Sequence, residues 1–150
     1  MIAFPELASS SPRPTGASGS LEAVLEAVRS FAERLAELPA REWVEVGTEL
    51  LRDESANDRR AAASALLGAT INGRGLVVAA WYVCDAIETS AFYASTANGW
   101  TPSDRRAFAA AHAAAEDAAL ALLAGEFLPV SYCAVLCEPF ALLAGVHRVG

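Results

Sequence analysis

The stretch LVVAAWYVCDAIETSAFYAS, residues 76–95, decides the fold class of this chain. On a helical wheel it is apolar on two opposite sides, and such a helix usually lies at the centre of its domain. Two acids, Asp85 and Glu88, share one of these sides with aromatic residues, where a carboxylate needs a partner or a function. One stripe contains Val78, Trp81, Asp85, Glu88 and Phe92, and the opposite stripe contains Leu76, Ala80, Val83, Ile87, Ala91 and Ala94.

Helical periodicity continues on both sides of this stretch, so the sequence predicts an all-α chain. The clearest helix start is Thr101-Pro102-Ser103-Asp104, in which threonine caps the helix, proline takes its first position and aspartate closes a capping box. A similar box, Ser55 with Asp58, is expected to start an earlier helix. The alternation at residues 43–46 leaves a short strand open as an alternative. The predicted helices cover about residues 20–38, 40–53, 55–71, 76–95, 101–124 and 130–144, the last of them broken near Pro139.

These elements predict a compact single-domain bundle of five to seven helices around the 76–95 helix. The connections are short, and alanine-rich faces let helices approach closely. We expect the bundle domain to span residues 20–150. Residues 1–19 are rich in Ser, Pro and Gly and predict a flexible N-terminal arm, with Phe4 and Leu7 as the side chains that would anchor it to a partner.

The composition narrows the classes of function. The chain has 150 residues, of which 54% are hydrophobic, and a formal net charge of −7. The apolar excess favours a homo-oligomer or a permanent protein partner, whereas the acidity argues against nucleic acid and against an anionic membrane. We expect no signal peptide, no segment long and apolar enough to span a bilayer, and no insertion into a membrane. The bias toward alanine and arginine favours a bacterial source, and three cysteines without a disulfide pattern favour the cytoplasm.

The first candidate site is the acid pair of the 76–95 helix. Asp85 and Glu88 lie three residues apart on one helix face, beside Trp81 and Phe92. Two carboxylates next to aromatic rings could hold a cationic ligand or act as a general acid or base. The sequence therefore suggests a ligand-binding pocket at these four residues.

Arginines of the neighbouring helices bear on the same acids. Arg59 and Arg60 open the preceding helix, and Arg105 and Arg106 open the following one. Arg59 or Arg60 could complete the pocket as a further ligand-binding group. The alternative is structural, since either arginine pair could neutralise the acids in an ion pair between helices.

Two weaker candidates are metal sites. His112 and Glu116, with Asp117 beside them, have the spacing of a shared metal ligand pair, but they also fit a solvated helix face. Cys133 and Cys137 would need Cys84 or His147 to make a zinc site, and their spacing fits buried core cysteines better. We expect no bound metal and no other cofactor.

The sequence contains no recognisable catalytic motif. The first hypothesis is therefore a non-catalytic bacterial protein that binds another protein, as a subunit, an adaptor or an acidic inhibitor of the antitoxin or immunity type. The alternative is a small helical enzyme or ligand-binding protein whose pocket lies around Trp81, Asp85, Glu88 and Phe92.

Overall fold

The computed structural model describes residues 21–145, and this part of the chain is helical throughout, without strands. The all-α prediction is confirmed. The strand alternative at residues 43–46 is wrong, because these residues lie inside a helix. Phe4, Leu7 and His147 lie outside the described residues. The helices are α1 (Leu21–Ala36), α2 (Ala40–Arg52), α3 (Glu54–Gly73), α4 (Val77–Ser95), α5 (Pro102–Ala124), α6 (Val130–Cys137) and the short α7 (Ala141–Ala144), with 3-10 turns at Gly125–Phe127 and Glu138–Phe140.

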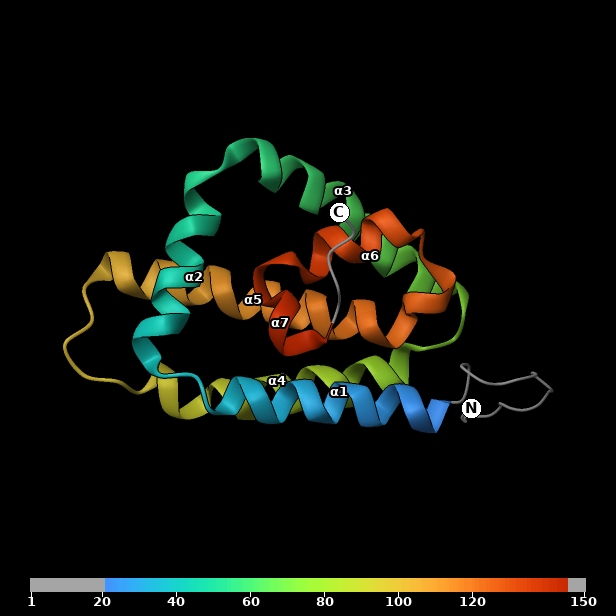
Figure 1. Cartoon of the computed structure of the whole chain (residues 1–150), viewed down its shortest axis with the longest axis horizontal. Coiled ribbons are helices and arrows are strands. Elements are labelled where there is room, and N and C mark those ends of the chain that lie inside the picture. Colours follow the sequence, from blue (N-terminus) through green and yellow to red (C-terminus); the bar gives the residue numbers. More distant parts are fainter. Residues whose placement is uncertain (1–20, 146–150) are drawn as a thin grey trace.

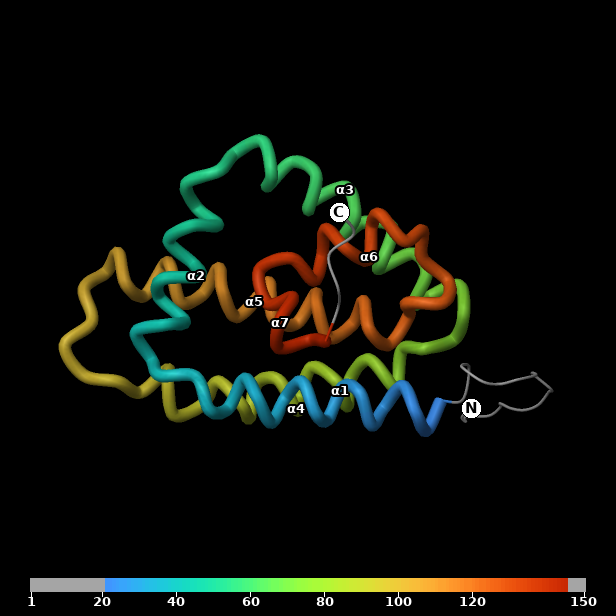
Figure 2. Tube along the Cα trace, viewed as in Figure 1, coloured from blue at the N-terminus to red at the C-terminus, as the bar shows by residue number. Residues whose placement is uncertain are grey.

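Helix α5 runs through the middle of the molecule, and the other helices pack around it (Figures 1 and 2). Helices α1 and α4 lie side by side along one edge and run in the same direction, opposite to α5. Helix α2 crosses α5 near one end, and α3 arches from there to α6. The buried residues of α5 are nearly all alanine, whose small side chain lets helices approach from several directions. The centre of the bundle is therefore α5 and not, as the sequence predicted, the 76–95 helix.

Helix α4 is buried on one side only. The stripe predicted to face the core, which includes Val83, Ile87 and Ala91, is buried. The opposite stripe, with Trp81 and Phe92, is exposed. A pattern that is apolar on two sides produces a buried helix only if neighbours cover both sides, and α1 and α5 cover only one. The side of α4 that carries Asp85 and Glu88 therefore faces solvent, and both acids are exposed.

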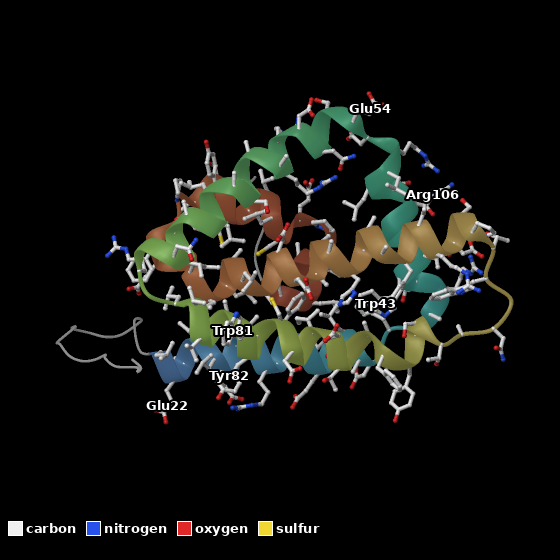
Figure 3. All side chains as sticks on the ribbon, turned by 180° about the vertical axis from the view of Figure 1, so that it is seen from behind. Glu22, Trp43, Glu54, Trp81, Tyr82 and Arg106 are labelled. Atoms are coloured by element: carbon white, nitrogen blue, oxygen red, sulfur yellow. The ribbon has the colours of Figure 1, made fainter. Side chains whose placement is uncertain are left out.

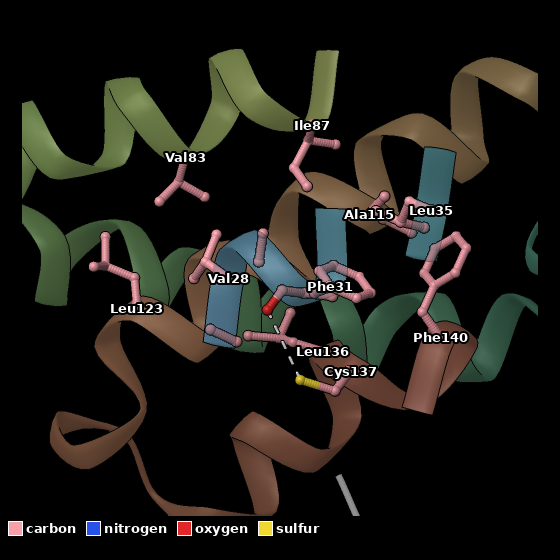
Figure 4. Close-up of a cluster of buried hydrophobic side chains, with 14 of the residues drawn as sticks. Val28, Phe31, Leu35, Val83, Ile87, Ala115, Leu123, Leu136, Cys137 and Phe140 are labelled. Atoms are coloured by element: carbon pink, nitrogen blue, oxygen red, sulfur yellow. Dashed lines mark hydrogen bonds between the residues drawn. The ribbon is translucent and has the colours of Figure 1, made fainter. Parts of the chain in front are cut away.

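A single core fixes α1 and α4 against α5 (Figure 4). The rings of Phe31 in α1 and Phe140 lie 6.2 Å apart in an edge-to-face arrangement. Trp43 of α2 is fully buried, with ring centroids 5.5 Å from Phe108 and 6.1 Å from Phe140. Because aromatic and branched side chains hold the inner faces in place, the outward faces of α1 and α4 have a defined relative position.

The helix starts follow local chemistry, with one correction. The capping box at α5 is confirmed: Asp104 N–H donates to the Thr101 hydroxyl at 3.0 Å, and Thr101 N–H donates to the Asp104 carboxylate at 3.1 Å. Helix α3 is capped by Asp53, whose carboxylate accepts from the N–H of Ala56 at 3.1 Å. The predicted Ser55–Asp58 box is wrong, because Ser55 already lies in the first turn of α3.

Of the helices in residues 21–145, one is long and apolar enough to cross a membrane by length and composition alone. It comprises α5 and the turn after it, Pro102–Phe127, which corrects the expectation that no segment meets this criterion. Within the bundle, 44% of the 18-residue window that meets this criterion is buried. The same composition belongs to the central helix of a bundle, which neighbours cover on several sides.

Candidate functional site

The outward side of α4 carries a row of exposed aromatic and aliphatic side chains. We call Val78, Trp81, Tyr82, Asp85, Glu88, Phe92 and Tyr93 the α4 face. Trp81 is 70% exposed, Tyr82 72% and Tyr93 82%, and Figure 3 shows Trp81 and Tyr82 on this helix. Contiguous apolar surface of this kind is uncommon in monomeric soluble proteins unless it binds something.

Four of the predicted ligand-binding residues lie together on the α4 face, but in solvent. Trp81, Asp85, Glu88 and Phe92 are all exposed, and Asp85 and Glu88 have no ion pair among residues 21–145. Exposed carboxylates need no compensating cation, because water solvates them. The acids are therefore surface groups of a mainly apolar face.

The predicted arginines lie elsewhere. Arg59 donates to the Ser55 hydroxyl at 3.3 Å, and Arg60 donates to the side-chain oxygen of Asn57. Arg60 also lines a pocket of about 340 Å³ between α2, α3 and α5, together with Asp117. The structure does not bring Arg59 or Arg60 to Asp85 and Glu88, and the ion-pair alternative does not hold within residues 21–145.

A groove of about 540 Å³ runs between the outward sides of α1 and α4, which pack against each other beneath it, and we call it the α1–α4 groove. Small residues such as Ala32 and Ala86 line it, Arg29 and Glu33 contribute from α1, and Tyr82, Thr89 and Tyr93 contribute from α4. The hydroxyl of Ser90 donates to the carbonyl of Ala32 at 2.7 Å and ties the two helices together. The groove is mainly apolar and is held between two packed helices.

A second depression of about 530 Å³, the α4–α5 pocket, lies on the other flank of α4. Glu88 and Phe92 line it from α4, and Phe108 and His112 line it from α5. The His112 Nε2 atom is buried without a hydrogen-bond partner among the described residues and lies 3.6 Å from the Glu116 carboxylate. Two of the four predicted pocket residues thus line a real depression, whereas Trp81 and Asp85 lie outside its lining.

Thr89 and Tyr93 line both depressions, so α4 forms a ridge between two grooves. Sequence reasoning did not single out Tyr82, Thr89 or Tyr93. Their spacing of seven and four residues places them on one stripe of the helix, which is a detectable signal. What the sequence lacked was the position of α1, which makes that stripe the wall of a groove.

The charged side chains that line the α1–α4 groove are Arg29 and Glu33, and Asp85 and Glu88 lie beside it on the α4 face. Arg29 is engaged by Glu26 on its own helix. Glu33, Asp85 and Glu88 have no ion pair among residues 21–145. A ligand that covers this side of the molecule therefore meets several carboxylates without a neutralising cation.

The residues weighed as candidate metal ligands do not assemble into a site within residues 21–145. Among residues 21–145, no group of three or more His, Cys, Asp or Glu side chains could hold a metal ion. Cys133 and Cys137 pack against α5, and each sulfur lies 3.9 Å from a carbonyl oxygen of that helix, as shown for Cys137 in Figure 4. A hydrogen bond to Cys133, together with burial, raises the pKa of the Cys137 thiol. Asp117 is half-buried, and this burial raises its pKa even though Ser64 donates a hydrogen bond to it.

The chain was compared with models of protein families, with curated proteins and with solved structures, and none of them matched.

Proposed function

We propose that this protein is a non-catalytic binding protein, bacterial and cytoplasmic, that acts by engaging another protein chain. A subunit, an adaptor or an acidic inhibitor of the antitoxin or immunity type would each work in this way. The observation that carries the proposal is the α4 face, on which Trp81, Tyr82 and Tyr93 are each at least 70% exposed. Keeping three such rings in water is unfavourable unless a partner covers them.

The residue types on this face are those that dominate protein interfaces. Tryptophan and tyrosine bury large areas with little loss of side-chain entropy, and they are enriched among the residues that contribute most to binding. The face lies on a packed helix, so its rings keep their relative positions before a partner arrives. Such preorganisation lowers the entropic cost of association.

The α4–α5 pocket favours a second candidate, a small helical enzyme or ligand-binding protein. Its lining combines a carboxylate, Glu88, with the rings of Phe92, Phe108 and His112. Such a set suits a small cation, which a carboxylate and aromatic faces attract together. In this case Glu88→Gln abolishes ligand binding and leaves the fold intact, whereas Asp85→Asn, at a residue outside the lining, leaves binding unchanged.

Native mass spectrometry of the untagged protein, purified from its own cells, tests the proposal. Wild type is compared with Trp81→Ser/Phe92→Ser, which interrupts the α4 face, and with Val130→Ser/Leu142→Ser, which changes two exposed residues outside it. We expect a second polypeptide on wild type and on the control variant and none on the α4 variant. A partner that stays on all three contradicts the role of the α4 face. A lone monomer in wild type contradicts the proposal, and a small extra mass on that monomer favours the second candidate.

A further inference from the structure

We propose that the α1–α4 groove is the docking site for a cationic amphipathic α-helix supplied by a partner protein. This inference rests on the proposed function and specifies both the location and the chemistry of the partner. The occupant lays its apolar side between α1 and α4 and places lysine or arginine on its flanks. Laying an amphipathic helix into an apolar groove is a recurrent mode of peptide recognition.

The groove has the dimensions of a short helix. It extends from Leu25 to Ala36 along α1 and from Tyr82 to Tyr93 along α4. About 12 helical residues correspond to roughly 18 Å, which is about three turns. Alanines at positions 32, 36 and 86 keep it open, because longer side chains at these positions would fill it. An incoming helix can therefore approach α1 and α4 closely, with Tyr82 and Tyr93 flanking it.

Carboxylates at and beside the groove favour an occupant with positive charge. Glu33 lines the groove from α1 and has no ion pair among residues 21–145. Asp85 and Glu88 lie outside the lining, on the neighbouring α4 face, and also have no ion pair in this part of the chain. Arg29, a cation at the groove, is engaged by Glu26. Lysine or arginine on the occupant would pair with these carboxylates and could also stack on the exposed tyrosines.

The same charges disfavour a second copy of this chain. Two α4 faces placed against each other would bring two Asp85 and two Glu88 carboxylates together, because these acids lie near the middle of the helix. Like charges placed opposite each other at an interface oppose association. Phospholipid headgroups that carry negative charge are disfavoured for the same reason.

Three synthetic peptides of about 18 residues test the chemistry on the full-length protein. The first has leucine at helical spacing with lysine on its flanks, the second has glutamate in place of lysine, and the third is a scrambled form of the first. Labelled-peptide anisotropy is measured at about 0.15 M salt, where long-range attraction between exposed charges is screened. We expect the first peptide to bind at least about tenfold more tightly than either of the others. Equal binding of the first and the scrambled peptide overturns the proposal, and so does no binding at all.

Thr89→Arg locates the site. Thr89 is exposed, lines the groove, and donates its hydroxyl to the carbonyl of Asp85. Thr48→Arg in α2 is the matched control, because Thr48 is also exposed and makes the same bond to Val44. We expect Thr89→Arg to weaken the lysine peptide at least about tenfold through bulk and like charge, and Thr48→Arg to leave it unchanged. Because Thr89 also lines the α4–α5 pocket, a second variant, Ala36→Arg, changes an exposed residue that lines the α1–α4 groove alone and should also weaken the peptide. Equal effects of Thr89→Arg and Thr48→Arg, or no effect of Ala36→Arg, overturn the assignment to this groove.

Two outcomes would contradict the cationic-helix inference without contradicting the proposed function. If Trp81→Ser/Phe92→Ser removes the natural partner while the lysine peptide does not bind, the α4 face is an interface and the cationic-helix inference is wrong. If wild type itself forms a dimer that Thr89→Arg dissociates, a second copy occupies the groove, and this inference is again wrong.

Discussion

At Gly47 the helices α2 and α5 come so close that only glycine fits. A Cβ atom at this position would lie 1.6 Å from the carbonyl oxygen of Ala107, which belongs to the backbone and cannot rotate away. We expect Gly47→Ala to force α2 away from α5 and to lower the free energy of unfolding by about 3 kcal/mol, at the upper end of overpacking effects. Urea denaturation followed by circular dichroism measures the change.

Gly68→Ala is the control for this prediction. Gly68 lies inside α3, and a Cβ there would meet no atom within 4 Å. Alanine is favoured over glycine in a helix interior by roughly 0.5–1 kcal/mol, so this variant should be more stable than wild type. A Gly47→Ala protein as stable as wild type would show that the two helices do not approach as closely as described.

Asp117 gives stability a specific dependence on pH. Burial raises its pKa above the ordinary value of 3.8, with the hydrogen bond from Ser64 opposing this. The folded protein therefore binds this proton more tightly than the unfolded chain does. The stabilisation is fully present below about pH 3.8 and is lost as the pH rises through the folded-state pKa. Asp117→Asn should remove this loss and be more stable than wild type near pH 7.

The comparison is made by measuring unfolding of both proteins between about pH 4 and pH 7. The difference should grow as the pH rises. Asp58→Asn on α3, an exposed position, is the control and should show no such trend. A constant difference between wild type and Asp117→Asn would show that this carboxyl titrates normally.

At the scale of the helix, the start of α3 depends on Asp53. This residue ends α2 and also caps α3, and its carboxylate accepts from the N–H of Ala56. We expect Asp53→Ala to cost about 1 kcal/mol, as is usual for the loss of an N-cap. Ser55→Ala should change the free energy of unfolding by less than about 0.5 kcal/mol, because Ser55 is exposed and is not the cap. The opposite order in urea denaturation would restore the Ser55 box that the sequence predicted.

The two caps show how far local sequence determines a helix start. The box at Thr101 was predictable because every group in it lies within four residues. The cap of α3 was not, because Asp53 and Ser55 are both good caps and the choice depends on where α2 ends. The residue at which α2 ends depends on how this helix packs against α5. A sequence pattern does not contain that information.

Helix α4 shows the same limit for the candidate site. The wheel identified the stripe of Val83, Ile87 and Ala91 that packs into the core, because burial follows helical periodicity. It could not tell whether the second stripe was covered, since that depends on which helices lie beside α4. Glu88 and Phe92 were found because they share a face, whereas Glu33 was missed because α1 brings it to the site from about 50 residues away.

At the scale of the whole molecule, the exposed aromatic face and the net charge have opposite effects on association between copies of the chain. The chain carries a net charge of −7, and repulsion between like-charged molecules opposes association. Asp85 and Glu88 concentrate part of this repulsion in the middle of the α4 face. We infer that these acids keep copies of the chain apart while leaving the face open to a cationic partner.

Asp85→Asn/Glu88→Gln tests this inference. Neutralising both acids leaves Trp81 and Tyr82 exposed and removes the local repulsion, so hydrophobic burial should drive self-association. We expect wild type to sediment as a monomer and the variant to form dimers at the same concentration. Glu42→Gln/Glu45→Gln in α2 makes the same change in net charge with the same spacing, and it should leave the protein monomeric. If both double variants associate equally, net charge alone controls self-association. The acids of the α4 face then have no specific role in keeping copies of the chain apart.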